Sequence, residues 1–261
     1  MRGFLIRAIL LALIAALPSA ALAAPTGATP VTLPFRVSDL SPDGKSFSTW
    51  TPDKLCVIDA ATLEQRVCAD LNGRRIHQVN PESIDWSPDS RAIAFVESPF
   101  LSFDDGDLWV MDAASGALSN LTDDVYTGSI LNIGDRLTHR TIYEDVASAW
   151  SPDGKTIAFS RSPIVNGKPA GNVIATIPAA GGTVKTIATV SASHLGLVVG
   201  GLAWTPDGAS IVYTVQGSRA GDPQNGVWMV GASGGEPRQL VAPDASLGHP
   251  LLLSIGGNGR S

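Results

Sequence analysis

Residues 148–160 read Ser-Ala-Trp-Ser-Pro-Asp-Gly-Lys-Thr-Ile-Ala-Phe-Ser, and this stretch decides the fold. Its centre is typical of a tight turn, because Pro presets φ, Asp hydrogen-bonds nearby backbone and Gly accepts a positive φ. The Ile-Ala-Phe-Ser run that follows is rich in β-branched and aromatic residues and therefore predicts a strand. A turn and a strand thus follow one another within a single short stretch.

The same template recurs at residues 37–46, 84–92 and 202–210. After each turn come a β-rich run, a second such run, a Gly/Ala-rich turn and a short fourth run. Four strands in a unit of roughly 45 residues are typical of one propeller blade. We therefore predict an all-β fold, a β-propeller of four-stranded antiparallel blades. The blades are expected at residues 37–72, 83–122, 147–188 and 201–240.

Residues 250–261 align with the beginning of the template and predict the start of a fifth blade. Four blades plus the start of a fifth indicate an incomplete ring, the front part of a longer propeller. The alternative is that this last strand completes an earlier blade by closing the ring.

The first 23 residues predict a cleaved signal peptide. Arg2 and Arg7 supply a positive start, residues 8–17 are apolar, and Ala21-Leu22-Ala23 fits the small-x-small cleavage pattern. A retained anchor helix is the alternative, but Pro18 interrupts a run that is short for a bilayer span. We expect a linker at residues 24–36, a periplasmic or extracellular mature protein, and no membrane span after cleavage.

Composition limits the possible functions. The chain is 44% hydrophobic and 16% charged, with a net charge of −6, and has no Lys/Arg cluster. Nucleic-acid binding is not expected, because it needs a basic face. The four histidines are isolated in sequence, so we predict no metal site and no cofactor.

Cys56 and Cys68 lie in one predicted hairpin. If its turn is centred near Thr62, the two residues face each other across the ladder. In an oxidising compartment a structural disulfide is expected. A redox role is not, because there is no Cys-x-x-Cys pattern.

The connections between predicted strands differ in length. Those from the first strand to the second and from the third to the fourth are short. The inserts, at residues 97–107, 123–146, 161–171, 188–200 and 216–225, all leave the blades at the opposite end. Long loops on one face of a rigid scaffold commonly carry binding sites. The candidate binding residues are Asp104, Asp105, Asp107, Tyr126, His139, Arg140 and Tyr143.

Two patterns suggest chemistry but fit plainer interpretations. Asp104, Asp105 and Asp107 offer carboxylates for Ca²⁺, yet their spacing is not that of an EF-hand, and a solvated acidic loop is favoured. Residues 231–235 match Gly-x-Ser-x-Gly, but they occupy a predicted turn between two strands, whereas a nucleophile elbow needs a strand followed by a helix. We predict no catalytic residue.

The repeat resembles the PD40, or WD40-like, propeller repeat of TolB-type exported proteins. The resemblance rests on the strings at residues 150–160 and 108–112 and covers roughly residues 35–261. It implies a periplasmic propeller that binds peptide segments of partner proteins. The sequence departs from the family in lacking the α/β domain that precedes a TolB propeller. The same repeat also resembles the propellers of prolyl-oligopeptidase-like peptidases, which precede a hydrolase domain.

Three functions remain open from the sequence. The favoured one is an exported binding module, not an enzyme, that engages a protein or peptide, or a glycan, through loops on one face. The second is the propeller portion of a serine peptidase whose catalytic domain is not in this chain. The third is a propeller enzyme with a metal ion or an acid pair in its central channel.

Overall fold

The computed structural model describes most of the predicted repeat region, and every described residue belongs to the compact unit Phe35–Ser261. The described residues are 37–51, 53–71, 84–96, 106–124, 141–166, 168–191, 198–216 and 222–242. The predicted signal peptide, the linker and the start of a fifth blade lie outside these residues. No helix in the described part is long and apolar enough to span a membrane.

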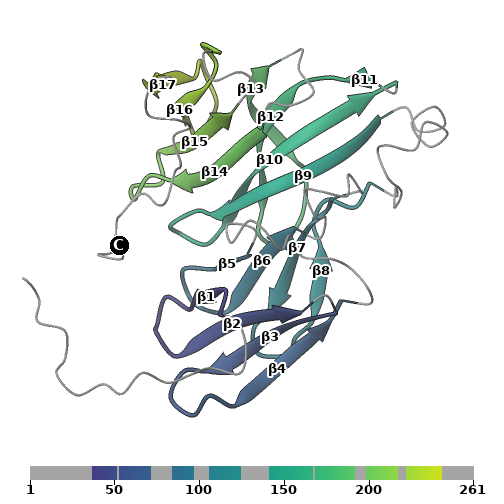
Figure 1. Cartoon of the computed structure of the whole chain (residues 1–261), viewed down its shortest axis with the longest axis vertical. Coiled ribbons are helices and arrows are strands. Elements are labelled where there is room, and N and C mark those ends of the chain that lie inside the picture. The colour runs from purple at the N-terminus through teal and green to yellow at the C-terminus, as the bar shows by residue number, and fades with distance from the viewer. Residues whose placement is uncertain are drawn as a thin grey trace, which may run out of the picture. The chain divides into compact units, whose positions relative to one another are not determined.

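The described residues form β-strands and no helix, and they are arranged in four antiparallel sheets, which we call blades 1 to 4 (Figure 1). Blade 1 contains β1 (Asp39–Leu40), β2 (Ser46–Thr51), β3 (Lys54–Asp59) and β4 (Gln65–Asp70). Blade 2 contains β5 (Ile84–Trp86), β6 (Ala92–Val96), β7 (Leu108–Asp112) and β8 (Leu118–Asn120). Blade 3 contains β9 (Thr141–Trp150), β10 (Thr156–Val165), β11 (Lys168–Pro169), β12 (Asn172–Pro178) and β13 (Lys185–Ser191). Blade 4 contains β14 (Val198–Trp204), β15 (Ser210–Gln216), β16 (Gly226–Gly231) and β17 (Arg238–Val241).

Strands follow one another in chain order within each blade, apart from the short β11, which pairs with β10. The prediction of four-stranded antiparallel propeller blades is therefore confirmed. The predicted loops are partly wrong at blade 3. Residues 141–146 and 161–165, expected in inserts, belong to β9 and β10, which pair with each other beyond the blade. Ile142 and Ile164 pack together there, so the extension buries apolar side chains of its own.

Each Ser/Thr-Pro-Asp turn is held by the same local hydrogen bonds. In blade 3, the Ser151 hydroxyl donates to Asp153 Oδ1 at 2.7 Å, and the N–H of Thr156 donates to Ser151 Oγ at 3.0 Å. The last turn residue has a left-handed backbone, with φ of 68° at Gly154. Ser90 takes the corresponding place in blade 2 with φ of 63°. The turn therefore depends on a few consecutive residues, which is why the sequence predicts it.

The three larger core clusters of the described residues each join two successive blades. One cluster packs Leu55 and Leu71 of blade 1 against Ile93 and Phe95 of blade 2. The next two join blade 2 to blade 3 and blade 3 to blade 4 in the same manner. Strands apolar on both faces are what stacked blades require.

We call the contact between two successive blades a joint. At two joints, the tryptophan that precedes the turn donates a hydrogen bond to the preceding blade. The indole N–H of Trp150 donates to the carbonyl of Asp85 at 3.1 Å, and that of Trp204 donates to the carbonyl of Ala149 at 3.0 Å. In both cases the acceptor lies on the first strand of the preceding blade. These bonds support the interpretation of the tryptophans as packing residues between blades.

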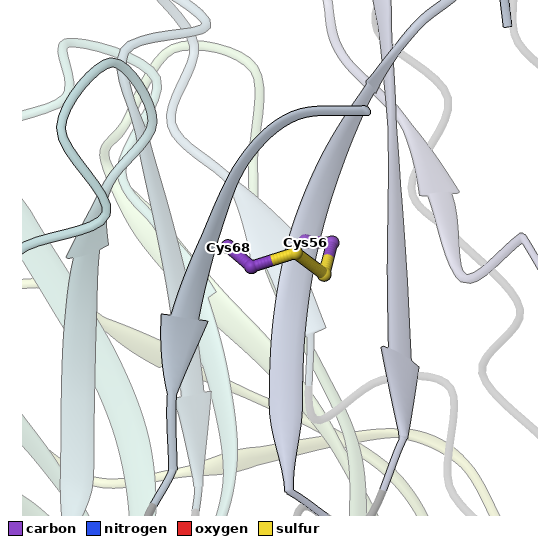
Figure 2. Close-up of a disulfide and its surroundings, with 2 residues drawn as sticks. All are labelled: Cys56 and Cys68. Carbon is purple, nitrogen blue, oxygen red and sulfur yellow. A yellow bond between two sulfur atoms is a disulfide. The ribbon is translucent and has the colours of Figure 1, made fainter. Parts of the chain in front are cut away.

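Cys56 and Cys68 form a disulfide between β3 and β4, with their Cα atoms 4.0 Å apart (Figure 2). They are directly opposite each other in the register, as the predicted hairpin required. The bond closes a short loop, and such a crosslink stabilises a fold by about 2–4 kcal/mol, chiefly through the unfolded chain. It makes β4, the outermost strand of blade 1, a fixed part of its sheet.

Candidate functional site

Two of the residues singled out from the sequence, Asp107 and Tyr143, are brought near each other where blade 2 meets blade 3. Asp107 precedes β7, and Tyr143 lies near the start of β9. The other five candidate residues lie outside the described part of the chain. They are Asp104, Asp105, Tyr126, His139 and Arg140.

Backbone contacts fix this meeting point. Gly106 pairs in parallel with Glu144, and the N–H of Asp145 donates to the carbonyl of Gly106 at 2.8 Å. The N–H of Tyr143 donates to Asp124 Oδ2 at 3.0 Å. The edge of β9 thus holds two segments of blade 2, one before β7 and one after β8.

Arg161 of β10 occupies the middle of the site. Its Nε donates to Asp145 Oδ1 at 2.7 Å and its Nη2 donates to Asp145 Oδ2 at 2.8 Å. The side chain of Arg161 is 9% exposed and that of Asp145 is fully buried. The guanidinium also lies over the rings of Tyr143 and Phe159, with Cζ 4.4 and 5.0 Å from their centroids. Two-point pairing and stacking give the guanidinium one fixed orientation.

Asp107 is 6% exposed and has uncharged donors around it. Asn120 Nδ2 donates to its Oδ2 at 2.7 Å, and Thr122 Oγ1 lies 3.5 Å from its Oδ1. Thr122 Oγ1 in turn accepts the N–H of Leu108 at 2.8 Å. No cation pairs directly with Asp107 among the residues described.

We call Asp107, Asp123, Asp124, Glu144, Asp145 and Arg161 the acidic network. It has five carboxyl groups and one guanidinium. Asp123 is exposed, Asp124 and Glu144 are half-buried, and the other three are buried. The network therefore has a buried floor, held by the Asp145–Arg161 pair, and an outer edge of more accessible carboxyl groups.

Burial dominates the electrostatics of the network. It raises the pKa of Asp107 to about 6, with the charges of Asp145, Asp124 and Asp123 adding to the effect. It also raises the pKa of Glu144 to about 7, with a further contribution from Asp145. Burial raises the pKa of Asp145 despite its bond to Arg161. A buried carboxyl resists ionisation because water no longer solvates its charge.

The described carboxyl groups of the network are not grouped in a way that could hold a metal ion. No group of three or more His, Cys, Asp or Glu side chains in the described ranges is arranged to hold a metal ion. Both carboxylate oxygens of Asp145 are already engaged by Arg161. What the arrangement offers chemically is negative charge on a fixed surface.

The Gly-x-Ser-x-Gly string has no catalytic geometry. Gly231 ends β16, and the N–H of Gly234 donates back to the carbonyl of Gly231 at 2.9 Å. The string therefore makes a turn between β16 and β17, as the sequence predicted. No helix follows it, so the strained elbow of a hydrolase is missing here.

Two grooves lie at the turn end of the blades, at equivalent positions of two joints. One, of about 450 Å³, is lined by residues including Arg66, Trp86 and Ser90. The other, of about 420 Å³, is lined by residues including Lys185 and Trp204. Their carboxylates belong to the turns and already accept turn hydrogen bonds, so we regard the acidic network as the better candidate.

Sequence reasoning missed Glu144, Asp145 and Arg161, which make up half of the network. A usable signal existed, since Tyr143-Glu144-Asp145 is an acidic pair just before the third repeat motif. Arg161 is likewise a charged residue directly after an apolar strand run. Neither pattern by itself shows that the residues are paired.

Comparisons with known proteins agree on the fold. A family model described as the dipeptidyl peptidase IV (DPP IV) N-terminal region matches residues 60–163, which is less than half of the chain. No curated protein matches the chain significantly. An oligogalacturonate lyase in complex with manganese is 14% identical, with a TM-score of 0.51, over 78% of this chain and 51% of that one. The chain is a β-propeller protein.

Further solved structures are similar at lower scores. TolB from Acinetobacter baumannii is 18% identical over 78% of this chain and 42% of its own, with a TM-score of 0.46. Dipeptidyl peptidase 4 from Porphyromonas gingivalis is 12% identical over 82% and 42%, with a TM-score of 0.38. This propeller chain covers 60% of the structure of a putative TolB from Agrobacterium tumefaciens and 42% of the Acinetobacter baumannii one. Likenesses at these identities concern the fold alone.

Proposed function

We propose that this chain is an exported propeller module that binds a positively charged segment of a protein or peptide at the acidic network. The observation that carries the proposal is the gathering of five carboxyl groups at one joint, where a single guanidinium pairs with one of them, Asp145. Export rests on the predicted signal peptide at residues 1–23. The module acts by binding and not by chemistry.

Charge complementarity supports this choice of partner. Asp123 is exposed and Glu144 is half-buried, so both can reach a ligand, while Asp145 and Arg161 hold the base of the site in place. Acidic surfaces attract cationic partners and exclude anionic ones. The connections that lead into Gly106 and out of Asp124 join the described residues beside the network, and they enlarge the proposed contact surface.

A labelled decapeptide of alternating Lys and Gly tests the proposal. We expect fluorescence anisotropy to show binding that weakens with salt, because the attraction is largely between solvent-exposed charges. At pH 8, where Glu144 with its pKa of about 7 is ionised, the double variant Asp123→Asn/Glu144→Gln should weaken binding about tenfold or more, as loss of two charge contacts predicts. The variant Asp207→Asn, in the turn of blade 4, is the matched control. Equal affinity of the double variant and the control would contradict the proposal, as would tighter binding of an Asp/Gly decapeptide.

A second function is favoured by one observation, the match of residues 60–163 to the dipeptidyl peptidase IV N-terminal region. In that case the chain is the propeller portion of a prolyl-oligopeptidase-like serine peptidase. Reading the gene beyond Ser261 decides between the two. A hydrolase domain with a nucleophile elbow there would support the peptidase, and a stop codon after further blades would eliminate it.

A further inference from the structure

The groove at the joint of blades 3 and 4 lies at the turn end of the strands. Strand β9 begins beside the acidic network and ends at the turn that borders this groove. The volume of the groove is about 420 Å³, and sites for small ligands usually measure about 300–1,000 Å³. Its polar and aromatic lining includes Asp153, Thr176, Lys185, Trp204 and Asp207.

Thr176 brings a hydroxyl without a partner into this groove. The residue pairs in the sheet with Ala158, which belongs to the cluster packed between blades 3 and 4. Directly paired residues point to the same face of a sheet, so the side chain of Thr176 faces blade 4. Thr176 is only 7% exposed, and its hydroxyl makes no hydrogen bond with the described residues. A buried hydroxyl that lacks a partner costs free energy, and a ligand that bonds to it removes this cost.

Trp204 gives the groove an accessible aromatic surface. It is half-buried, whereas Trp86 and Trp150, at the equivalent positions of blades 2 and 3, are 3% and 9% exposed. The indole N–H of Trp204 already donates to the carbonyl of Ala149 at 3.0 Å. The part of Trp204 that remains for a ligand is therefore the apolar face of its ring.

Charged groups of both signs border the groove. Asp153 and Asp207 accept the hydrogen bonds of their own turns through Oδ1, so Oδ2 of each carboxylate remains available to a ligand. Lys185 is exposed, and its Nζ donates to the carbonyl of Ser233 at 3.2 Å. An ammonium group has three protons to donate, so Lys185 can serve a ligand as well.

The equivalent groove at the joint of blades 1 and 2 lacks these features. Val57 takes the position of Thr176 there, because it pairs with Ser48 as Thr176 pairs with Ala158. The hydroxyl of Ser46 in that groove accepts Nη1 of Arg66 at 3.0 Å. The repeat architecture therefore does not require the free hydroxyl and the exposed indole that occur between blades 3 and 4.

We propose that the groove between blades 3 and 4 binds a neutral sugar. A sugar ring has an apolar face of C–H groups, which suits the indole of Trp204, and a rim of hydroxyls that donate and accept hydrogen bonds. Its hydroxyls donate to Oδ2 of Asp153 and Asp207 and accept from Lys185, while Thr176 serves in either sense. Because charges of both signs surround the groove, a ligand of strong charge meets repulsion as well as attraction. This site goes beyond the proposed function and does not depend on it.

Calorimetric titration of the full chain with cellotriose, maltotriose and mannotriose tests the proposal. We expect at least one of these neutral trisaccharides to bind with a Kd of about 1 mM or tighter. Added salt should leave this affinity unchanged, because the ligand carries no charge to be screened. Failure of all three to bind at about 10 mM would overturn the proposal. Tighter binding of the cationic glucosamine trimer would also overturn it, by showing that the groove selects charge.

A matched pair of variants locates the site. Thr176→Val introduces the residue that the other groove has at this position, and it removes the hydroxyl with little change of shape. We expect it to weaken sugar binding about fivefold or more, since one hydrogen bond is lost. Thr186→Val is the control, because Thr186 pairs with Ala175 on the opposite face of the same blade. Equal affinities of the two variants would contradict the assignment of the groove.

An NMR titration gives a second measurement that needs only the wild-type fold. The indole N–H resonance of Trp204 is assigned by its loss in Trp204→Phe. It should shift as the bound trisaccharide is added, whereas the resonance of Trp86 should stay in place. A sugar that binds without moving the Trp204 resonance binds elsewhere, and that result would overturn the proposal even if the affinity is as expected.

Discussion

The turns and the acidic network place the same chemical group in opposite surroundings. At the turns, Asp43, Asp89, Asp153 and Asp207 are surrounded by donors from their own turn, chiefly hydroxyl and backbone N–H groups, and these lower the pKa of each carboxyl. In the network, burial raises the pKa of Asp107 and Glu144 instead. The number and position of nearby donors decide the sign, because a hydrogen bond to the charged form favours it and desolvation opposes it.

The difference separates structure from function in this propeller. The same turn geometry occurs in all four blades and precedes the second strand in each. Among the described residues the network occurs at a single joint, and its groups come from four separate segments of chain. A feature that repeats with the blades serves the fold, whereas a feature found once on a repeated scaffold is a candidate for a specific role.

The largest expected effect comes from removing the cation of the network. Arg161→Met leaves Asp145 buried without its partner, so we expect a loss of about 3–5 kcal/mol in the free energy of unfolding. Urea denaturation measures it. The double variant Arg161→Met/Asp145→Asn should recover part of the loss. If Arg161→Met were as stable as the wild type, the Asp145–Arg161 pair would not be what holds the floor of the site in place.

The second effect concerns pH. Glu144 has a folded pKa of about 7 against an ordinary value of 4.5, so its contribution is full below pH 4.5 and is lost as the pH rises through 7. Glu144→Gln should therefore be more stable than the wild type at pH 8 by about 1–2 kcal/mol, after allowing for its partial exposure. At pH 4.5 the two should agree. Thermal unfolding at both values checks this, and a variant less stable at pH 8 would contradict it.

A third prediction compares two turns. Gly154→Ala forces a residue with a Cβ into φ of 68°, while its Cβ would meet only Pro88 Cδ at 3.7 Å, an ordinary contact. The expected cost is about 1 kcal/mol, from backbone strain alone. In blade 2, Ser90→Gly relieves the same strain but removes the bond from the N–H of Asp43 to Ser90 Oγ at 3.0 Å. We expect the free energy of unfolding of Ser90→Gly, measured by urea denaturation, to be close to that of the wild type.

The smallest effect is expected in acid at the turns. The pKa of Asp153 is lowered by Ser151 and the N–H of Lys155, so its contribution is present above the unfolded pKa and is lost as the pH falls through the folded value. Asp153→Asn should lower the melting temperature slightly at pH 7 and make no difference at pH 2. If the melting temperatures differed only at pH 2, the lowered pKa of Asp153, and with it the contrast between turns and network, would be contradicted.

Much of the fold could be predicted because its signals are local. The Pro-Asp turns, the β-rich runs after them and the opposition of Cys56 and Cys68 follow from a few consecutive residues or from one hairpin. The loops assigned to residues 141–146 and 161–165 were wrong, since β9 and β10 continue by pairing with each other and burying Ile142 and Ile164. Nothing in the spacing of the repeats indicates how far a hairpin extends beyond its blade.

The sequence by itself determined the repeat, the strand order and the disulfide, because turn chemistry and strand alternation act over short stretches of chain. Only the tertiary structure decided that Gly106 pairs with Glu144, that Tyr143 hydrogen-bonds Asp124, and that Arg161 pairs with Asp145. The first two contacts join blade 2 to blade 3, and the third joins two strands of blade 3. Their energies depend on burial and on the distance between charges, neither of which exists until the blades have packed together.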